Sequence, residues 1–228
     1  MEEKTHKTQE GLKPLECDNT KILPEILILG SFPGIGSLES GEYYHEDNNK
    51  NRIWEVICEI YNDYPVPQID EYDKKKALLA RHRIVLWDYY KTAARKNPDS
   101  SDKSLVGIEH NDIIDYLKKH TTIKKVVING KGKIYKAIEK EIKRDIENDS
   151  KLKNRGIEVF RLPSTNGLNT RYAKTLSRHW SALNSFLIKA PNGGIKGFGA
   201  PYCCPACERF SQTEKCQYCG SLCNIVMY

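Results

Sequence analysis

The chain lacks any run of apolar residues long enough to cross a membrane, and its polar start, MEEKTHKTQE, has no hydrophobic stretch like that of a signal peptide. We therefore expect a cytoplasmic protein without a membrane partner. In that reducing compartment, its eight cysteines are expected to be thiols or metal ligands rather than disulfides.

Carboxylates are missing from one long stretch, because no Asp or Glu lies between Glu158 and Glu208. The net charge of the whole chain is +6, and this stretch holds basic side chains that no acidic neighbour in sequence offsets: Arg161, Arg171, Lys174, Arg178, Lys189 and Lys196. Such a surface suits DNA, since each neutralised phosphate releases counterions. The spacing of Arg171, Lys174 and Arg178 predicts one face of a helix. The lysine-rich segment 131–153 is interpreted as a solvated surface.

Strand-like and helix-like patterns alternate along the chain, whose length of 228 residues suffices for one core and a small appendage. The alternation predicts a three-layer α/β/α fold with a central four-stranded parallel sheet. Residues 1–20 are expected to form a polar lead-in. The predicted strands cover 26–29, 84–87, 126–128 and 157–160, and the predicted helices cover 53–61, 72–82, 113–117, 134–146 and 172–187.

Cysteines gather behind a glycine-rich linker at 191–202. Residues 203–228 contain two CxxC pairs, which supply four soft ligands on two tight turns: Cys204, Cys207, Cys216 and Cys219. This spacing is typical of tetrahedral structural zinc, so the tail is predicted to be a small C-terminal zinc ribbon. Cys203 and Cys223 flank the set and could replace a ligand.

Two turn-forming segments follow predicted strands, Gly30-Ser31-Phe32-Pro33-Gly34 and Leu162-Pro163-Ser164-Thr165-Asn166. Both should emerge at the carboxyl ends of buried parallel strands, where open α/β sheets bind ligands. The pairing of these two motifs predicts an active site.

The first motif, followed by Ser37-Leu38, Tyr43-Tyr44, Asn51 and Trp54, and the second motif together resemble the uracil-DNA glycosylase superfamily. Within it they are similar to the hypoxanthine DNA glycosylase branch, whose motifs read approximately GSMPGxxSL…YYxHPRNxFW and LPSTSPAN. The resemblance covers about residues 22 to 188. It implies that residues 21–190 form a monofunctional DNA glycosylase domain, which uses water as nucleophile and needs no nucleotide cofactor. A monomer is expected.

The resemblance also implies roles for individual residues in holding a nucleotide flipped out of the duplex. The pocket for the base would contain Gly30, Ser31, Phe32, Pro33, Gly34, Tyr44 and Asp88. Phe32 could stack on the base, and Asp88 could accept a hydrogen bond from a ring N–H. Ser164 and Thr165 would bind a phosphate, with Asn166 beside them, and Leu168 or Asn169 would fill the vacated hole. Asn129-Gly130 ends the third strand and is interpreted as packing.

The catalytic loop departs from the family pattern. It is two residues longer between Tyr-Tyr and Trp, and it lacks the proline. Its spacing from Trp54 favours Asn51 as the asparagine that positions water. Alternatives in the inserted residues are Asn48, Asn49, Asp47 and Glu46, the last two as general bases.

The altered loop leaves the substrate open. Hypoxanthine or uracil is the default, and a modified base of phage DNA, which would indicate antiviral defence, is a variant. A DNA-binding module without hydrolysis is the alternative from another class. An iron-sulfur cluster, carried by another branch of the superfamily, competes with zinc, but its ligands are dispersed through the catalytic domain rather than packed into a tail.

Overall fold

The structure is a computed structural model that describes residues 8–16, 23–45, 51–95 and 105–183, together with the backbone of five short strands between residues 187 and 225. The chain divides into two compact units. The first comprises residues 1–52 and 67–170, and the second comprises residues 53–66 and 171–228.

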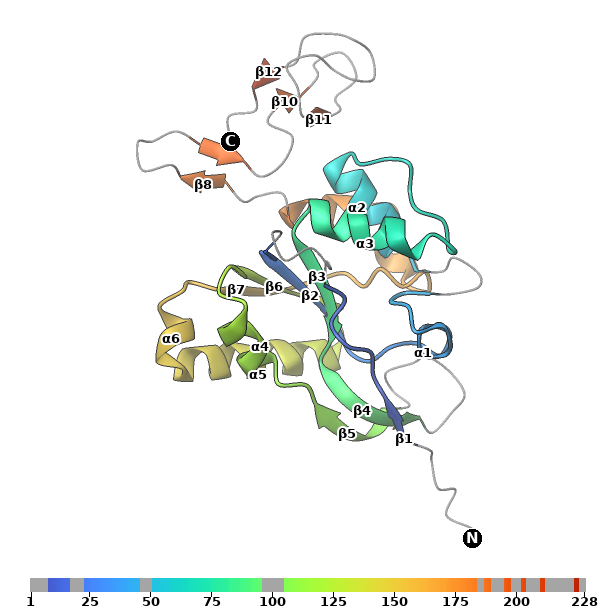
Figure 1. Cartoon of the computed structure of the whole chain (residues 1–228), viewed down its shortest axis with the longest axis vertical. Helices are drawn as coiled ribbons and strands as arrows, with labels where there is room; N and C mark the ends of the chain where they lie inside the picture. Colours follow the sequence, from blue (N-terminus) through green and yellow to red (C-terminus); the bar gives the residue numbers. More distant parts are fainter. Residues whose placement is uncertain are drawn as a thin grey trace. The chain divides into compact units, whose positions relative to one another are not determined.

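The first unit is built on a parallel sheet of four strands in the order β3-β2-β6-β7 (Figure 1). The strands are β2 (Ile26–Gly30), β3 (Ile84–Asp88), β6 (Lys125–Asn129) and β7 (Glu158–Leu162). Every residue of β2, β3 and β6 is buried, as expected for parallel strands covered on both faces. The predicted four-stranded sheet is confirmed.

The strand register brings the carboxyl ends of the strands to one edge of the sheet. Gly30 lies opposite Asp88, and Asn129 lies opposite Leu162. β7 ends at Leu162, two residues later than the predicted strand, so the second motif begins inside the sheet.

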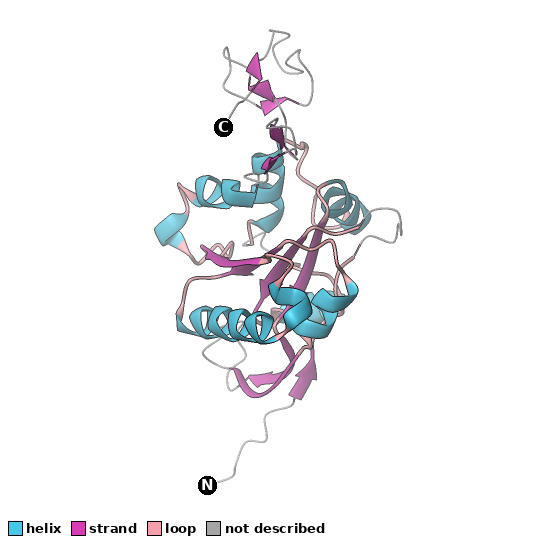
Figure 2. Ribbon diagram, turned by 90° about the vertical axis from the view of Figure 1, so that its left-hand side faces the viewer, coloured by secondary structure: helices cyan, strands magenta, loops and turns pink. Residues whose placement is uncertain are grey.

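Helices of the first unit cover both faces of the sheet. They are α3 (Tyr72–Arg81), α4 (Ile113–Lys119), α5 (Lys133–Asn148) and α6 (Ser150–Lys153). In the strand order, the connection from β2 to β3 moves toward one edge of the sheet, whereas the connections from β3 to β6 and from β6 to β7 move toward the other edge. Right-handed crossovers therefore place α3 on one face and α4 and α5 on the other (Figures 1 and 2).

Two details of these helices bear on the sequence predictions. The predicted helix over 134–146 forms part of α5, which buries Ile138, Ile142 and Ile146 on one face. The predicted helix over 113–117 forms α4, which is capped by Asp112, whose side chain accepts a hydrogen bond from the Asp115 N–H at 2.8 Å. Asn111 instead donates its side-chain amide to the Asp88 carbonyl at 2.9 Å.

A second, antiparallel sheet in this unit was not predicted. It has the order β1-β4-β5 and consists of β1 (Thr8–Glu10), β4 (Tyr90–Arg95) and β5 (Leu105–His110). Residues 8–16 were expected to lie in a polar lead-in, but they are part of the folded unit. β1 pairs with β4, and Leu15 forms a backbone bridge to Leu86 of β3 in the parallel sheet. The pairing is made by backbone groups, so the polar side chains of β1 gave no sign of it.

The second unit contains α2 (Ile53–Tyr61) and α7 (Leu176–Trp180), which pack together. Helix α2 lies where it was predicted. The predicted long helix over 172–187 is wrong in its continuity, because α7 is preceded by the 3-10 turn η2 (Thr170–Tyr172) and followed by η3 (Ser181–Leu183) and the strand β8 (Leu187–Lys189). Leu176, Trp180 and Leu183 are nevertheless buried at intervals close to those of a helix.

In the tail, β8 pairs with β9 (Ile195–Gly197), and β10 (Tyr202–Cys203) pairs with both β11 (Phe210–Ser211) and β12 (Asn224–Ile225). The four cysteines proposed as zinc ligands lie outside the described residues.

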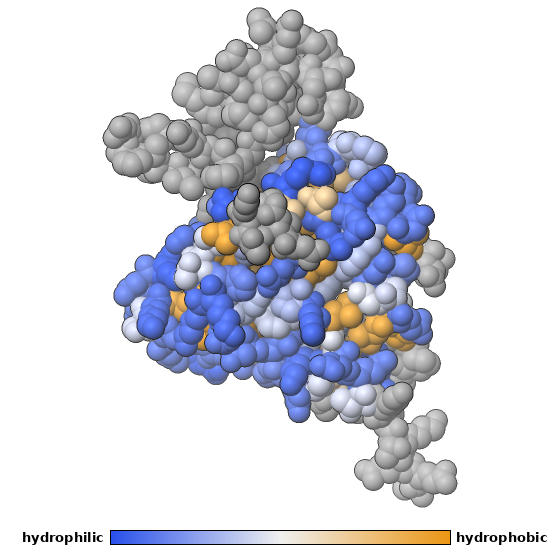
Figure 3. All heavy atoms as spheres, in the orientation of Figure 1, coloured by the Kyte–Doolittle hydropathy of each residue, from blue (hydrophilic) through white to orange (hydrophobic). Residues whose placement is uncertain are grey.

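On the face drawn in Figure 3, the described side chains are mostly hydrophilic, with small apolar patches between them. Among the described residues, no helix is both long enough and apolar enough to cross a bilayer.

Candidate active site

A pocket of about 590 Å³ lies in the first unit, at the edge where the parallel strands end. It brings both motifs together with the end of β3, the end of β6 and the start of α5. Its lining residues are Gly30, Ser31, Phe32, Pro33, Gly34, Ser37, Tyr43, Tyr44, Asn51, Asp88, Asn129, Lys131, Gly132, Tyr135, Ser164, Asn166, Leu168 and Asn169. All seven residues predicted for the base pocket are among them.

The first motif needs glycine at its start because Asp88 lies directly against it. A Cβ atom on Gly30 would stand 2.2 Å from Oδ1 of Asp88. The Asp88 side chain is 3% exposed, and it lies beside Tyr43, where its charge adds to burial in raising the pKa of the Tyr43 hydroxyl. Asp88 therefore presents a desolvated acceptor at the pocket wall, as a reader of a ring N–H requires.

Asn51 is joined to the second motif by a chain of hydrogen bonds. Thr165 Oγ1 donates to Asn51 Oδ1 at 2.8 Å, and Asn129 Nδ2 donates to Thr165 Oγ1 at 2.9 Å. Asn129 Oδ1 in turn accepts the Thr165 N–H at 3.0 Å. The backbone adds a bridge between Asn51 and Asn166. These contacts hold the Asn51 amide in one orientation at the pocket.

The structure corrects the role expected for Thr165. Its side chain is 0% exposed, and both its hydroxyl and its N–H bond to protein groups, so it is placed to orient Asn51 rather than to bind a phosphate. Ser164 remains at the pocket, where Asn169 Nδ2 donates to its carbonyl at 2.9 Å. Leu168 is 79% exposed at the same turn, as a side chain that enters a duplex must be.

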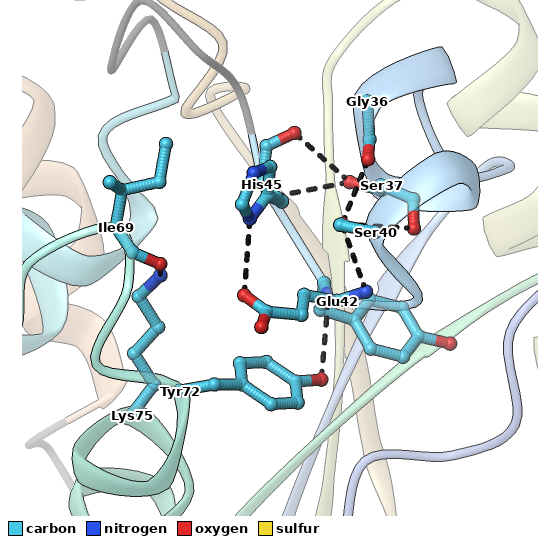
Figure 4. A network of polar contacts seen from close by, with 9 residues as sticks. Gly36, Ser37, Ser40, Glu42, His45, Ile69, Tyr72 and Lys75 are labelled. Carbon is cyan, nitrogen blue, oxygen red and sulfur yellow. Dashed lines mark hydrogen bonds and ion pairs between the residues drawn. The ribbon is translucent and has the colours of Figure 1, made fainter.

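A polar network that includes Ser37, Glu42 and His45 holds the turn over residues 41–45 in place (Figure 4). The turn follows α1 (Ile35–Ser40), and Tyr44 has the left-handed φ of 54°. The His45 N–H donates to Ser37 Oγ at 3.1 Å, and the His45 ring lies 3.1 Å from Glu42 Oε2. Asn129 Nδ2 reaches the Tyr44 hydroxyl at 3.2 Å.

The inserted residues Asp47 and Asn49 follow this turn and, like Asn48 and Glu46, lie outside the described residues. Their proposed roles stay predictions.

Sequence reasoning missed Asn129, which was interpreted as packing, as well as Tyr43, Lys131 and Tyr135. The signal that could have found Asn129 was a polar residue directly after the apolar run 126–128, at the carboxyl end of a parallel strand, where Asp88 stands on its own strand. Tyr135 closes over Gly130, where a Cβ atom would meet its ring at 2.4 Å, and its hydroxyl lies 3.5 Å from Ser31 Oγ.

The carboxylate-free stretch is less uniformly electropositive than its sequence suggested. Arg161 pairs with Glu139 of α5, Nε to Oε2 at 2.5 Å, and donates to the Lys131 carbonyl. Arg171, Lys174 and Arg178 are all exposed in the second unit, but they occupy η2, a turn and α7 rather than one helix face. These three side chains are available to bind phosphates, whereas Arg161 is occupied as long as it pairs with Glu139.

A parallel α/β sheet with a pocket of this size at its carboxyl edge, lined by an aromatic ring, amides and a buried carboxylate, is typical of an active site that binds a small ligand. Residues 17–188 match the model of the uracil DNA glycosylase superfamily, and the chain belongs to this family.

Two relatives and one solved structure give the similarity in detail. The chain is 31% identical over 159 residues to a hypoxanthine DNA glycosylase of Methanosarcina acetivorans, covering 70% of this chain and 89% of the relative. It is 28% identical over 173 residues to a hypoxanthine DNA glycosylase of Methanosarcina barkeri, covering 76% and 96%. A solution NMR structure of a candidate uracil DNA glycosylase from M. acetivorans superposes with a TM-score of 0.57 at 26% identity, covering 77% and 96%.

The chain is therefore a DNA glycosylase, a hydrolase of DNA repair whose partner is DNA.

Proposed function

We propose that the chain removes hypoxanthine from DNA by hydrolysing the bond between the base and its deoxyribose. The proposal rests on one observation above all: the Asn51 amide lines the same pocket as both motifs and accepts a hydrogen bond there from Thr165 of the second motif. Two relatives named hypoxanthine DNA glycosylase support the choice of base.

In the proposed reaction, the flipped nucleotide places its base in the pocket and its sugar at the mouth, near Asn51. The C1′–N9 bond breaks, its electron pair leaves with the base, and the sugar gains positive charge. Water held by Asn51 adds to C1′, and the proton it loses neutralises the base anion through solvent. Asn51 acts by placing water where the charge develops, which is the interaction that accelerates the step.

Asp88 is proposed to select the base. Hypoxanthine carries an N–H donor next to a carbonyl, whereas adenine carries a bare ring nitrogen at the same place. A desolvated carboxylate accepts from the donor and repels the lone pair. Uracil also presents an N–H flanked by carbonyls, so it is the second candidate base.

A comparison of duplexes containing hypoxanthine, uracil or a phage-type modified cytosine tests the choice of base. Alkali-labile abasic sites should form fastest with hypoxanthine. Asp88→Asn should lower the rate on hypoxanthine. Any residual rate on adenine should fall less, because the asparagine amide can turn its N–H donor toward the bare ring nitrogen of adenine. A faster reaction on the modified cytosine would replace the repair proposal with one of phage defence.

We also propose that the tail binds one structural zinc ion through Cys204, Cys207, Cys216 and Cys219. Four thiolates in two CxxC pairs are a chemically complete tetrahedral donor set, which leaves no position for catalysis. Elemental analysis of the purified protein should find zinc at one equivalent. Stoichiometric iron, or no metal, would contradict this proposal without touching the base-removal proposal.

A further inference from the structure

The unpredicted antiparallel sheet supports the first motif. Tyr90 in β4 donates its N–H to the Ser31 carbonyl at 2.9 Å. Gly11, just after β1, approaches Phe32 so closely that a Cβ atom on it would lie 3.2 Å from Cε2 of the ring. Phe32 therefore packs closely against the backbone that follows β1, a segment that does not line the pocket.

Arg95, the last residue of β4, completes this support. The guanidinium carbon of Arg95 lies 5.2 Å from the centre of the Phe32 ring, within cation–π range. The Nη2 atom of Arg95 also donates a 2.7 Å hydrogen bond to the Pro33 carbonyl, which fixes the guanidinium beside the motif. Phe32 lines the pocket, and Arg95 is not among the described residues that do so.

We propose that Arg95 is a positioning residue that holds Phe32 as the stacking surface for the flipped base and sets a positive charge on the far side of that ring. The inference rests on the proposed function, because it concerns the base that leaves the same pocket.

The physical consequence falls on the transition state. The face of an aromatic ring is electronegative, and a cation on one side draws that density toward itself. The opposite face then repels less as a stacked base gains negative charge. The neutral base in the ground state benefits less, so the pair should accelerate bond breaking more than it tightens DNA binding.

The test is a double-mutant cycle on the single-turnover rate, made with Arg95→Met and Phe32→Leu in the full chain. Arg95→Met should slow release of the preferred base about tenfold, the scale of a desolvated cation–π contact. DNA affinity should stay within about twofold of wild type. In the Phe32→Leu background, Arg95→Met should add almost nothing, because the ring through which it acts is gone.

Two further variants separate this role from a structural one. Arg95→Lys keeps the charge and should recover most of the rate, even if Arg95→Met folds poorly. Lys91→Met removes an exposed lysine from the same strand and should leave the rate unchanged. Equal losses from Arg95→Met in both backgrounds, or no recovery with lysine, would overturn the inference and leave the proposed function standing. A wild-type protein that releases no base would overturn both.

Discussion

The hydroxyl of Thr165 donates a 2.8 Å hydrogen bond to Oδ1 of Asn51, a residue 114 positions earlier in the chain. Thr165 is fully buried and is itself held by Asn129 at the end of β6. The amide proposed to position water thus takes its orientation from the end of the central sheet, even though it belongs to a polar loop. An anchored group of this kind loses little freedom when the substrate arrives.

Replacing Asn51 with alanine removes the amide and leaves the pocket wall in place. The single-turnover rate on the preferred DNA should fall roughly a hundredfold to ten-thousandfold, the range for loss of a positioned catalytic group. DNA affinity should remain near wild type, since the missing interaction matters only when water meets the charged sugar. Asn148→Ala, at the exposed end of α5, is the matched control. An unchanged rate for Asn51→Ala would assign the chemistry to the inserted residues, of which Asp47 is the next to test.

Replacing Thr165 with valine should slow base release while the fold survives. Valine keeps the shape of threonine but cannot donate to Asn51 or accept from Asn129, so the Asn51 amide is free to turn. We expect a loss of about tenfold or more in the single-turnover rate and a cost of about 1–3 kcal/mol in unfolding free energy, as for buried polar groups left unpaired. Thr165→Ser retains the hydroxyl and should keep most of the rate. A serine variant as slow as the valine variant would contradict this role, because serine keeps the hydroxyl that donates to Asn51.

The exposed basic residues of the second unit should govern the salt dependence of DNA binding. Alanine at Arg171, Lys174 and Arg178 together should weaken binding at all sequences and lower the slope of log affinity against log salt by about one for each phosphate that the protein no longer neutralises. Arg161→Ala serves as the comparison, because Glu139 already neutralises that residue. A slope that changes with Arg161→Ala and not with the triple variant would reverse the assignment.

Lys125 should make the free energy of unfolding depend on pH in the alkaline range. Burial lowers the pKa of its ammonium group to about 8, against an ordinary value of 10.5, although Glu158 offsets part of the effect. Between about pH 8 and 10.5 the unfolded chain holds a proton that the folded chain has released, so the unfolding free energy should rise with pH there. Lys125→Met should lose this rise in urea unfolding measured from pH 7 to 10, and Lys124→Met, at an exposed neighbour, should keep it. Parallel curves for wild type and Lys125→Met would contradict the assignment.

Strands β2, β3 and β6 of the central sheet could be predicted because they are buried on both faces and contain short apolar runs, such as ILIL at 26–29. β4 has the sequence YKTAAR and carries no such pattern, so the antiparallel sheet it belongs to was missed. The last helix was extended too far because its buried residues keep helical spacing through turns that are only partly helical.

At the site, the motifs and Asn51 could be placed from spacing and resemblance alone. The part played by Asn129 could not, because it depends on which side chains meet across strand ends. For the same reason, Thr165 was expected to bind a phosphate, whereas its side chain and N–H bond to Asn51 and Asn129. Burial decides between a phosphate ligand and a hydrogen-bonding partner, and the sequence of a polar turn does not report burial.

Release of free base from a duplex containing a single hypoxanthine tests the central claim most directly. Wild-type protein in excess over the duplex should release hypoxanthine in an amount equal to the DNA and leave one alkali-labile abasic site per duplex, while Asn51→Ala, bound to the same DNA, should release it far more slowly. Tight binding of the duplex by wild-type protein, with neither free base nor abasic sites formed on hypoxanthine, uracil or modified-cytosine DNA, would contradict the account and identify a DNA-binding module that has kept the fold and lost the hydrolysis.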